Sequence, residues 1–252
     1  LSAQRPIDPK SGRLVAGGVK EQTAQCLRNV KAILESSDGP FDDIVKITVF
    51  LKDLADLEAV DEVYTTFFPD SGIARTVGYV PARTVVEVSA LPMDALVQVE
   101  AVVSHGDGTP PQAVEDRHGL IIEANNTENA PKSPYSTQTV AFSHYNHISA
   151  QLPLDPATGH MVKGGVKEQA DQCLKNIRAI LESIGHSMED VVKVNIFLKN
   201  IDDADAVDEV YTTFFRDGIP ARRTVGVSAL PEGALIQIDA VAGNAEGTPP
   251  VV

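Results

Sequence analysis

The chain has 252 residues, of which 43% are hydrophobic, and a formal net charge of −14. This length and composition are typical of one or two soluble globular domains. The acidic charge opposes the binding of nucleic acid, and no basic stripe offsets it. The longest apolar runs, such as Ile44 to Leu51, are too short to span a membrane, and that run is interrupted by Lys46. We therefore expect neither nucleic acid nor a membrane as a partner.

The start of the chain and its cysteines predict a cytoplasmic protein. Leu1 opens directly into a polar segment, without a basic and apolar leader. Cys26 and Cys173 are the two cysteines, and they occupy equivalent positions of a repeat. A disulfide would require these positions to meet across an interface. We expect buried free thiols in a reducing compartment instead.

The sequence contains the same unit twice. AVDEVYTTFF at Ala59 to Phe68 recurs letter for letter at Ala206 to Phe215, and GGVKEQ from Gly17 recurs from Gly164. A period this long indicates two copies of a whole domain. The offset between the copies falls from 147 to 139 residues, which places an eight-residue insertion in copy one near Ser71 to Tyr79. We predict copy one at 1–104, a Gly- and Pro-rich linker at 105–119, copy two at 120–243 and a tail at 244–252.

In chain order, the predicted elements start late in copy one. The counterparts of Leu120 to His147 would precede residue 1, so either residues are missing upstream or the first domain lacks its opening hairpin. Copy two shows the whole unit, because alternating and 3.6-residue apolar patterns follow one another along it. Its predicted strands are Leu120–Ala124, Gln138–Phe142, Asn146–Ala150, Val191–Leu198, Thr224–Ala229 and Ala234–Val241, and its helices run from after Gly165 to about Ser183 and over Ala204–Phe215.

This order, βββαβαββ, predicts an α+β domain in which two helices back a mixed sheet. Such a sheet leaves one face to cover, and a domain of this size covers it by association. We therefore expect the protein to form oligomers.

Few patterns along the chain could carry chemistry. His144 and His147 fall on opposite faces of a strand with no third ligand nearby, so no metal site is predicted. The sequence shows no nucleophile elbow, phosphate-binding glycine loop or redox CxxC motif. Gly17 and Gly164 are interpreted as helix starts rather than as anion sites. We expect no cofactor.

An arginine and an acid recur near the end of each copy. VPARTVVEVSALP at 80–92 and IPARRTVGVSALP at 219–231 place Arg83 and Arg222 two residues after a proline that fixes the entry to a strand. Either arginine could point into an interface or pair with a surface carboxylate. Glu100 and Asp239 lie in the last strands, LVQVEAVV and LIQIDAVA. An acid in such an apolar run is paired with a cation or kept for proton transfer.

Several motifs together resemble the Rid family of reactive-intermediate deaminases, also called YjgF-like. They are NAPKSPYSTQTV at 129–140, SAQLPLDPATG at 149–159, the GGVKEQ and VYTTFF segments, PAR followed by SALP, and IQIDAVA. The resemblance spans Leu120 to Val241 and Ser2 to Val103. It implies two tandem chorismate-mutase-like α+β domains, trimers of domains, and ligand sites in the clefts between neighbouring domains. It also implies hydrolysis of 2-imino and 2-enamino acids to 2-keto acids and ammonia.

The resemblance assigns a role to residues that match the family's motifs. It implies that an arginine holds the substrate carboxylate, and the matching residues are Arg83 and Arg222. It implies that a tyrosine and a small residue line the ligand, which are Tyr135 and either Ala3 or Ala150. It also implies that an acid positions water, and the matching acids are Glu100 and Asp239. Asp239 is one methylene shorter than the family's acid, Arg223 adds a cation beside Arg222, and copy one lacks the tyrosine loop.

We therefore predict a metal- and cofactor-independent imine deaminase acting on small anionic imino acids such as 2-aminoacrylate. Three chains give six domains, enough for two rings of three, so a homotrimer is predicted. The main alternative is a non-catalytic protein of the same family that binds small carboxylates or has a regulatory role. A weaker alternative is an endoribonuclease or translation inhibitor. A further hypothesis is that Tyr135 completes a cleft containing Arg83 across the domain boundary.

Overall fold

The computed structural model describes residues 1–37, 39–68, 79–104, 122–142, 144–216 and 218–243. The predicted linker at 105–119, the tail at 244–252 and all but Tyr79 of the predicted insertion lie outside the described residues. None of the helices among the described residues combines the length and the apolar character needed to cross a membrane.

Copy one is a three-stranded sheet with two long helices. Its elements are β1 (Ile7–Asp8), β2 (Arg13–Leu14), α1 (Val19–Ser36), β3 (Ile44–Leu51), α2 (Leu57–Phe67), β4 (Ala82–Glu87) and β5 (Val97–Val103). The sheet order is β4-β3-β5, with β4 parallel and β5 antiparallel to β3. The first two strands form a separate small hairpin.

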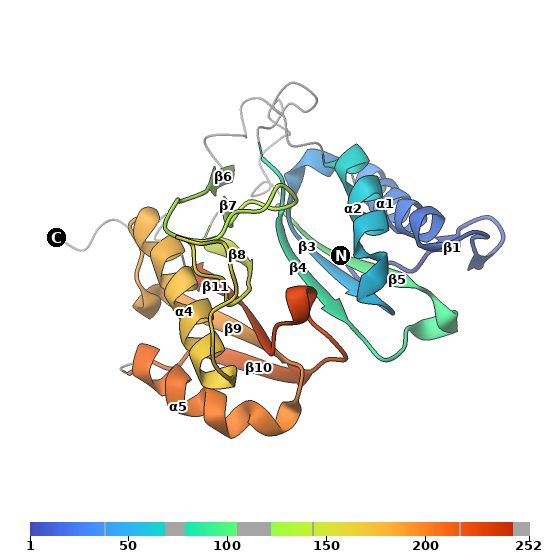
Figure 1. Cartoon of the computed structure of the whole chain (residues 1–252). Coiled ribbons are helices and arrows are strands. Elements are labelled where there is room, and N and C mark those ends of the chain that lie inside the picture. The colour runs from blue at the N-terminus through green and yellow to red at the C-terminus, as the bar shows by residue number, and fades with distance from the viewer. Residues whose placement is uncertain (38, 69–78, 105–121, 143, 217, 244–252) are drawn as a thin grey trace.

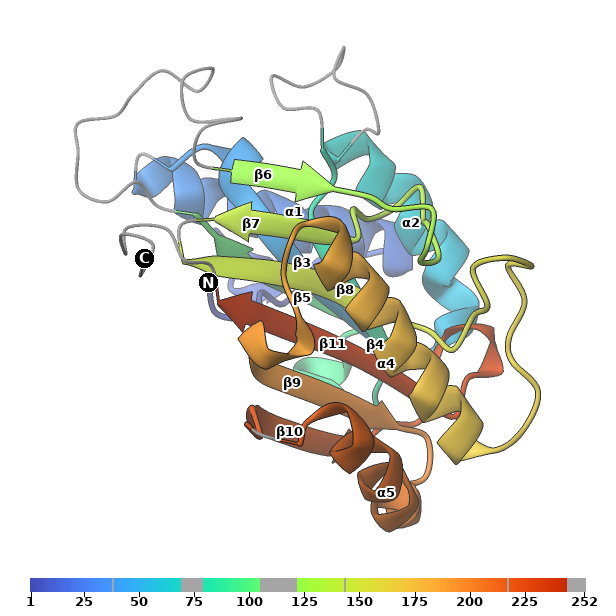
Figure 2. The ribbon, with the colours of Figure 1, turned by 90° about the vertical axis from the view of Figure 1, so that its left-hand side faces the viewer.

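Copy two confirms the predicted order βββαβαββ. Its elements are β6 (Ile122–Asn125), β7 (Thr139–Phe142), β8 (Tyr145–Gln151), α4 (Val166–Ser183), β9 (Val191–Leu198), α5 (Ala204–Phe214), β10 (Ala221–Gly226) and β11 (Ile236–Gly243). The six strands lie in the order β10-β9-β11-β8-β7-β6 (Figure 2), and only β10 and β9 are parallel. Most strand ends differ from the prediction by one or two residues, and β10 differs by three: it runs from Ala221 to Gly226 rather than from Thr224 to Ala229. Arg222 therefore lies inside this strand, opposite Val194.

The first long helix of each copy, α1 and α4, starts at a glycine pair, as predicted. Gly17 has a φ of +112°, and a Cβ at this position would lie 2.7 Å from the side chain of Glu21. The Glu21 carboxylate accepts a hydrogen bond from the backbone N–H of Gly18 at 2.8 Å, which satisfies one of the free donors of the first turn. The same arrangement recurs at the start of α4. Glycine is therefore needed for backbone geometry here.

Each copy buries an apolar core between its helices and one face of its sheet. In copy two the core includes Cys173, Ile177, Ile180 and Leu181 on one side of α4, as the 3.6-residue spacing predicts. Both cysteines are buried free thiols, and burial raises the pKa of Cys26 to about 12. Thiols of this kind are unreactive near neutral pH.

The two copies dock through their sheets. Figure 1 shows the helices of both copies on the outside and the two sheets facing each other, with β4 of copy one against β8 of copy two. Two apolar clusters bridge the copies, one around Val45, Ala82 and Val140, the other around Val86 and Phe197. Burial of β4 contrasts with the exposure of its counterpart β10. The docking therefore covers the free face of copy one's sheet, and it does so around Arg83.

Candidate active site

Arg83 lies at the centre of the contact between the copies. Its side chain is 6% exposed, and its guanidinium carbon lies 4.4 Å from the ring centroid of Tyr64 on α2 and 5.9 Å from that of Tyr135 in copy two. The backbone N–H of Arg83 donates to Ser149 Oγ of β8 at 2.9 Å. The guanidinium is therefore held between aromatic rings from both copies.

The guanidinium of Arg83 keeps unused hydrogen-bond donors. Nη2 lies 2.6 Å from Asp61 Oδ1, at ion-pair distance. Among the described residues, however, neither Nε, nor Nη2, nor Asp61 Oδ1 has a partner with hydrogen-bond geometry. Nε and Nη2 form one edge of the guanidinium, and such an edge binds a carboxylate with two parallel hydrogen bonds. Nε has no acceptor among the described residues, and a buried donor is costly unless a ligand supplies one.

A pocket of about 380 Å³ opens beside Asp61, the ion-pair partner of Arg83. Asp61 from α2 lines it on the copy one side, and Tyr135, Ser149 and Ala150 line it on the copy two side. Lys132 and Glu232 also line the pocket. The volume lies in the lower part of the range usual for small-molecule sites. The pocket is thus a cleft between two domains of one chain.

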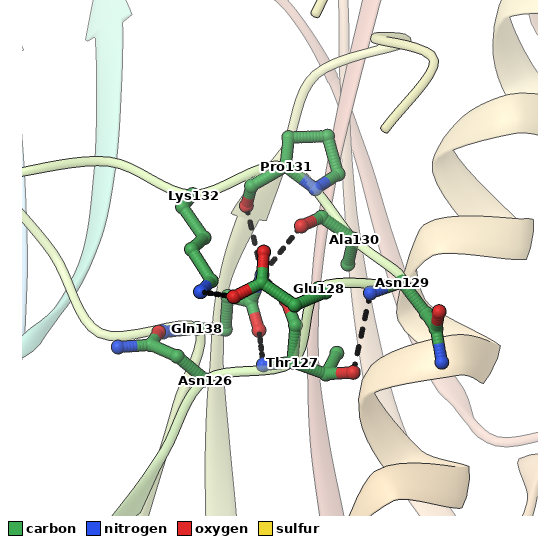
Figure 3. A network of polar contacts seen from close by, with 8 residues as sticks. All are labelled: Asn126, Thr127, Glu128, Asn129, Ala130, Pro131, Lys132 and Gln138. Atoms are coloured by element: carbon green, nitrogen blue, oxygen red, sulfur yellow. Dashed lines mark hydrogen bonds and ion pairs between the residues drawn. The ribbon is translucent and has the colours of Figure 1, made fainter. Parts of the chain in front are cut away.

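The loop that carries Tyr135 is organised by a buried amide. Figure 3 shows Gln138, which is 2% exposed, inside the loop of residues 126–132. Its Nε2 donates to the backbone carbonyls of Thr127, Ala130 and Pro131 at 3.0, 2.8 and 3.0 Å, and its Oε1 accepts from the Thr127 N–H at 2.6 Å. Glu128 and Lys132 pair across the outside of the loop. One side chain therefore satisfies backbone groups that an irregular loop would otherwise leave unpaired.

Asp239 does not lie in this pocket, which corrects its predicted catalytic role. The residue is 2% exposed. Its Oδ2 lies 2.8 Å from Lys46 Nζ and accepts from Thr84 Oγ1 at 2.6 Å, while Oδ1 accepts from Asn195 Nδ2 at 2.5 Å. Burial alone would raise the pKa of the Asp239 carboxyl, but Lys46 and these hydrogen bonds outweigh it and lower the pKa. Both oxygens already have protein partners, so the carboxylate is poorly placed to hold a catalytic water.

Lys46 makes this cluster a link between the copies. It lies on β3 of copy one, and besides the ion pair its Nζ donates to the backbone carbonyl of Ile148 on β8 at 3.2 Å. Ile148 precedes Ser149, whose Oγ receives the Arg83 N–H. The buried Lys46–Asp239 pair therefore adjoins the strands that bring Arg83 and Tyr135 together.

His147, beside this cluster, predicts a pH dependence of stability. Burial, aided by the charge of Lys46 and opposed by that of Asp239, lowers the pKa of His147 from 6.5 to about 4. Between these values the unfolded chain binds a proton that the folded chain rejects, so the free energy of unfolding should fall as the pH drops from about 6.5 to about 4. Urea unfolding at a series of pH values should show a flatter dependence for His147→Gln. Equal slopes in the two proteins would contradict the assignment.

The remaining predicted site residues separate into two groups. Ala150 lines the pocket with Tyr135, as predicted. Ala3, its counterpart, lies instead in a hollow against α1, and its carbonyl accepts from Gln98. Glu100 is half-buried on β5, which β3 separates from β4 and Arg83. The structure therefore does not bring Ala3 or Glu100 to the cleft.

Arg222 forms a closed pair rather than an open site. Its Nη1 and Nη2 donate to the two carboxylate oxygens of Asp208 at 2.6 and 3.3 Å, and its guanidinium carbon lies 5.0 Å from the centroid of Tyr211. These are the counterparts of Arg83, Asp61 and Tyr64. In the described chain, Tyr135 lies against Arg83, so the Arg222 arrangement has no matching tyrosine loop from this chain.

Sequence reasoning missed four residues that line or adjoin the pocket: Asp61, Ser149, Lys46 and Gln138. Asp61 had a usable signal, because it belongs to the decamer that recurs unchanged, where Asp208 is its counterpart. An acid that is buried on α2 requires a cation nearby. The other three act across the contact between the copies or inside an irregular loop, and no periodicity marks such positions.

Comparison with known proteins identifies the family. The family described as Endoribonuclease L-PSP matches residues 1–105 and again 126–244, and the chain belongs to this family, whose domain it carries twice. A RutC family protein of Pyrococcus horikoshii is 48% identical over 118 residues, covering 46% of this chain and 93% of the relative. Human 2-iminobutanoate/2-iminopropanoate deaminase is 42% identical over 125 residues, covering 49% of this chain and 90% of the relative.

Solved structures resemble one copy of the chain. A member of the Rid protein family from Yersinia pestis, described as of unknown function, is 40% identical and covers 49% of this chain and 99% of its own, with a TM-score of 0.47. RidA from an Antarctic Psychrobacter is 35% identical and covers 48% of this chain and 99% of its own, also with a TM-score of 0.47. Both cover about half of this chain because it contains the domain twice.

Proposed function

We propose that the chain hydrolyses small 2-imino and 2-enamino acids to 2-keto acids and ammonia in the cleft between its two copies. One observation carries the proposal: Arg83 is buried with an unpaired Nε, between an ion pair to Asp61 and the ring of Tyr135, two residues that line one pocket. The 42% identity to the human 2-iminobutanoate/2-iminopropanoate deaminase supports the choice of substrate class. The homologous domain and a free carboxylate-binding edge therefore point to the same chemistry.

The geometry suits a substrate that needs little activation. Two charge-assisted hydrogen bonds from Arg83 would hold the substrate carboxylate and fix the neighbouring C2 atom. An imine carbon is already electrophilic, so water can attack it once the carbon is positioned. Tyr135 and Ala150 border the pocket, and with the Gln138-organised loop they would limit the size of the substrate side chain. The cleft thus selects a short 2-imino acid.

A coupled assay tests this proposal. A serine or threonine dehydratase generates 2-aminoacrylate in situ, and the release of the keto acid is timed with and without the protein. We expect the protein to accelerate keto-acid release. A rate equal to that in buffer would refute the deaminase proposal.

A non-catalytic carboxylate-binding protein is the second candidate, favoured by one observation. Asp239, at the position of the family's acid, is bonded to Lys46, Thr84 and Asn195 instead of facing the pocket. Isothermal titration with 2-oxobutanoate separates the two candidates when combined with the coupled assay. Binding without any turnover would favour the second.

The homotrimer stays a prediction. Two rings of three equivalent domains would place the two copies of each chain in different rings, whereas here the copies of one chain share the cleft. Light scattering of the intact protein decides the number of chains. A three-chain mass would support the homotrimer that the domain count predicts, and a one-chain or two-chain mass would contradict it while leaving the cleft within the chain intact.

A further inference from the structure

Asp61 is an acid in the pocket that the motifs do not account for. It lies on α2, is 8% exposed, and lines the pocket beside Arg83. Its Oδ1 has no hydrogen-bond partner among the described residues, although Arg83 Nη2 is 2.6 Å away. Asp239 is already occupied by Lys46. Asp61 is therefore a carboxylate that both borders the pocket and contacts the arginine proposed to hold the substrate.

The same two residue types behave differently in the two copies. In copy two, Arg222 and Asp208 make two hydrogen bonds with each other, and the Asp208 side chain is 45% exposed. In copy one, Arg83 and Asp61 lie at ion-pair distance but leave the Nε–Nη2 edge and Oδ1 without hydrogen bonds. Of the two pairs, the Arg83–Asp61 pair is the one that borders the pocket between the copies and keeps an unpaired Nε.

We propose that Asp61 is the catalytic acid–base of the cleft, taking a proton from the attacking water and returning it to the leaving nitrogen. This inference rests on the proposed deaminase function. Burial raises the pKa of the Asp61 carboxyl above its usual 3.8, against the lowering effect of Arg83. A carboxyl whose pKa moves towards the working pH exchanges protons more readily.

The proton balance of the reaction closes with this one group. Water forms a bond to C2 of the iminium, the C=N π electrons pass to nitrogen, and the water gives one proton to the Asp61 carboxylate. Asp61 then protonates the amino group, the C–N bond breaks, and ammonia leaves as the hydroxyl oxygen forms the carbonyl. The hydroxyl proton returns to Asp61 and passes to ammonia. The products are the 2-keto acid and ammonium, with Asp61 ionised again.

The surroundings of Asp61 set the expected pH dependence. Arg83 faces it from β4, Lys132 and Tyr135 border the pocket from the loop of copy two, and Glu232 borders it from the short turn Pro231–Gly233, while Tyr64 lies on its own helix. Asp61 must be ionised to accept a proton, so kcat should fall as the pH drops through its raised pKa. Replacing the carboxyl should remove this acidic limb.

The test compares Asp61→Asn with Asp208→Asn, its matched control in the incomplete arrangement. For Asp61→Asn we expect kcat for 2-iminobutanoate to fall by about 10²–10⁴, the acidic limb to disappear, and the Kd of 2-oxobutanoate to stay equal or decrease because a negative charge is removed. Asp208→Asn should leave kcat unchanged. An unchanged kcat in Asp61→Asn would overturn the proposal.

A structural role for Asp61 gives a different result. If Asp61 only orients Arg83, then Asp61→Asn weakens 2-oxobutanoate binding as much as it lowers kcat/KM, and this outcome also overturns the proposal. If circular dichroism shows that Asp61→Asn is unfolded, Asp61→Glu decides, because it should retain partial kcat with a shifted acidic limb. Wild-type protein that binds 2-oxobutanoate without turnover would instead refute the proposed function itself.

Discussion

Replacing Arg83 by alanine is expected to lower kcat/KM for 2-iminobutanoate by about 10²–10⁴. Two hydrogen bonds to a charged group contribute about 1.5–3 kcal/mol each, and each 1.4 kcal/mol corresponds to a factor of ten. Arg83 offers both bonds from one buried edge, whereas Arg222 has already closed its fork on Asp208. Steady-state kinetics of Arg83→Ala and Arg222→Ala should therefore differ strongly.

Arg83→Lys controls for the charge that Asp61 requires. Lysine keeps a cation near the buried carboxylate but lacks the planar fork, so it should retain stability while losing most of kcat/KM. Thermal melting of all three variants separates misfolding from loss of binding. Equal halving of the activity by Arg83→Ala and Arg222→Ala would show two independent sites and would contradict the single cleft.

Replacing Asp239 by alanine is expected to reduce the free energy of unfolding by about 3–5 kcal/mol, because Lys46 would remain buried without its partner. The Lys46 side chain is 7% exposed, and its Nζ lies 2.8 Å from Asp239 Oδ2. Glu100→Ala is the matched control, since Glu100 is the half-buried counterpart in copy one. That control should change the stability by only about 0.5 kcal/mol, as is usual for substitutions away from buried networks.

The double variant Lys46→Met, Asp239→Leu separates position from chemistry. Apolar residues of similar volume often replace a buried ion pair without loss of stability. We therefore expect the double variant to recover stability relative to Asp239→Ala and to keep most of the deaminase rate. A stable double variant without activity would show that Asp239 has a catalytic role after all.

The sequence was sufficient for the architecture within each copy. Strands and helices follow from apolar periodicity, and Val191–Leu198 was predicted with the observed bounds. The start of β10 was misplaced by three residues because the run Ala221 to Arg223 is polar and exposed, so no alternation marks it as a strand. A strand at an uncovered edge leaves little hydrophobic pattern.

The candidate site was only partly predictable. Tyr135 of copy two lies against Arg83 of copy one, the contact that the mixed-cleft hypothesis described, and Tyr135 and Ala150 line one pocket. Asp239 was recognised as an acid that is either paired or catalytic and was assigned a catalytic role, but its partner, Lys46, lies on the other copy. Contacts between the copies depend on how the two domains dock, and the pattern of residues along the chain does not show this. The role of Asp61 was hidden for the same reason.

The most direct test of the account is the number of keto-acid sites per chain. Isothermal titration of the intact protein with 2-oxobutanoate should give one site per chain, lost in Arg83→Ala and retained in Arg222→Ala. Two sites per chain, or one site that survives Arg83→Ala, would contradict a single cleft built from Arg83 of copy one and the Tyr135 loop of copy two.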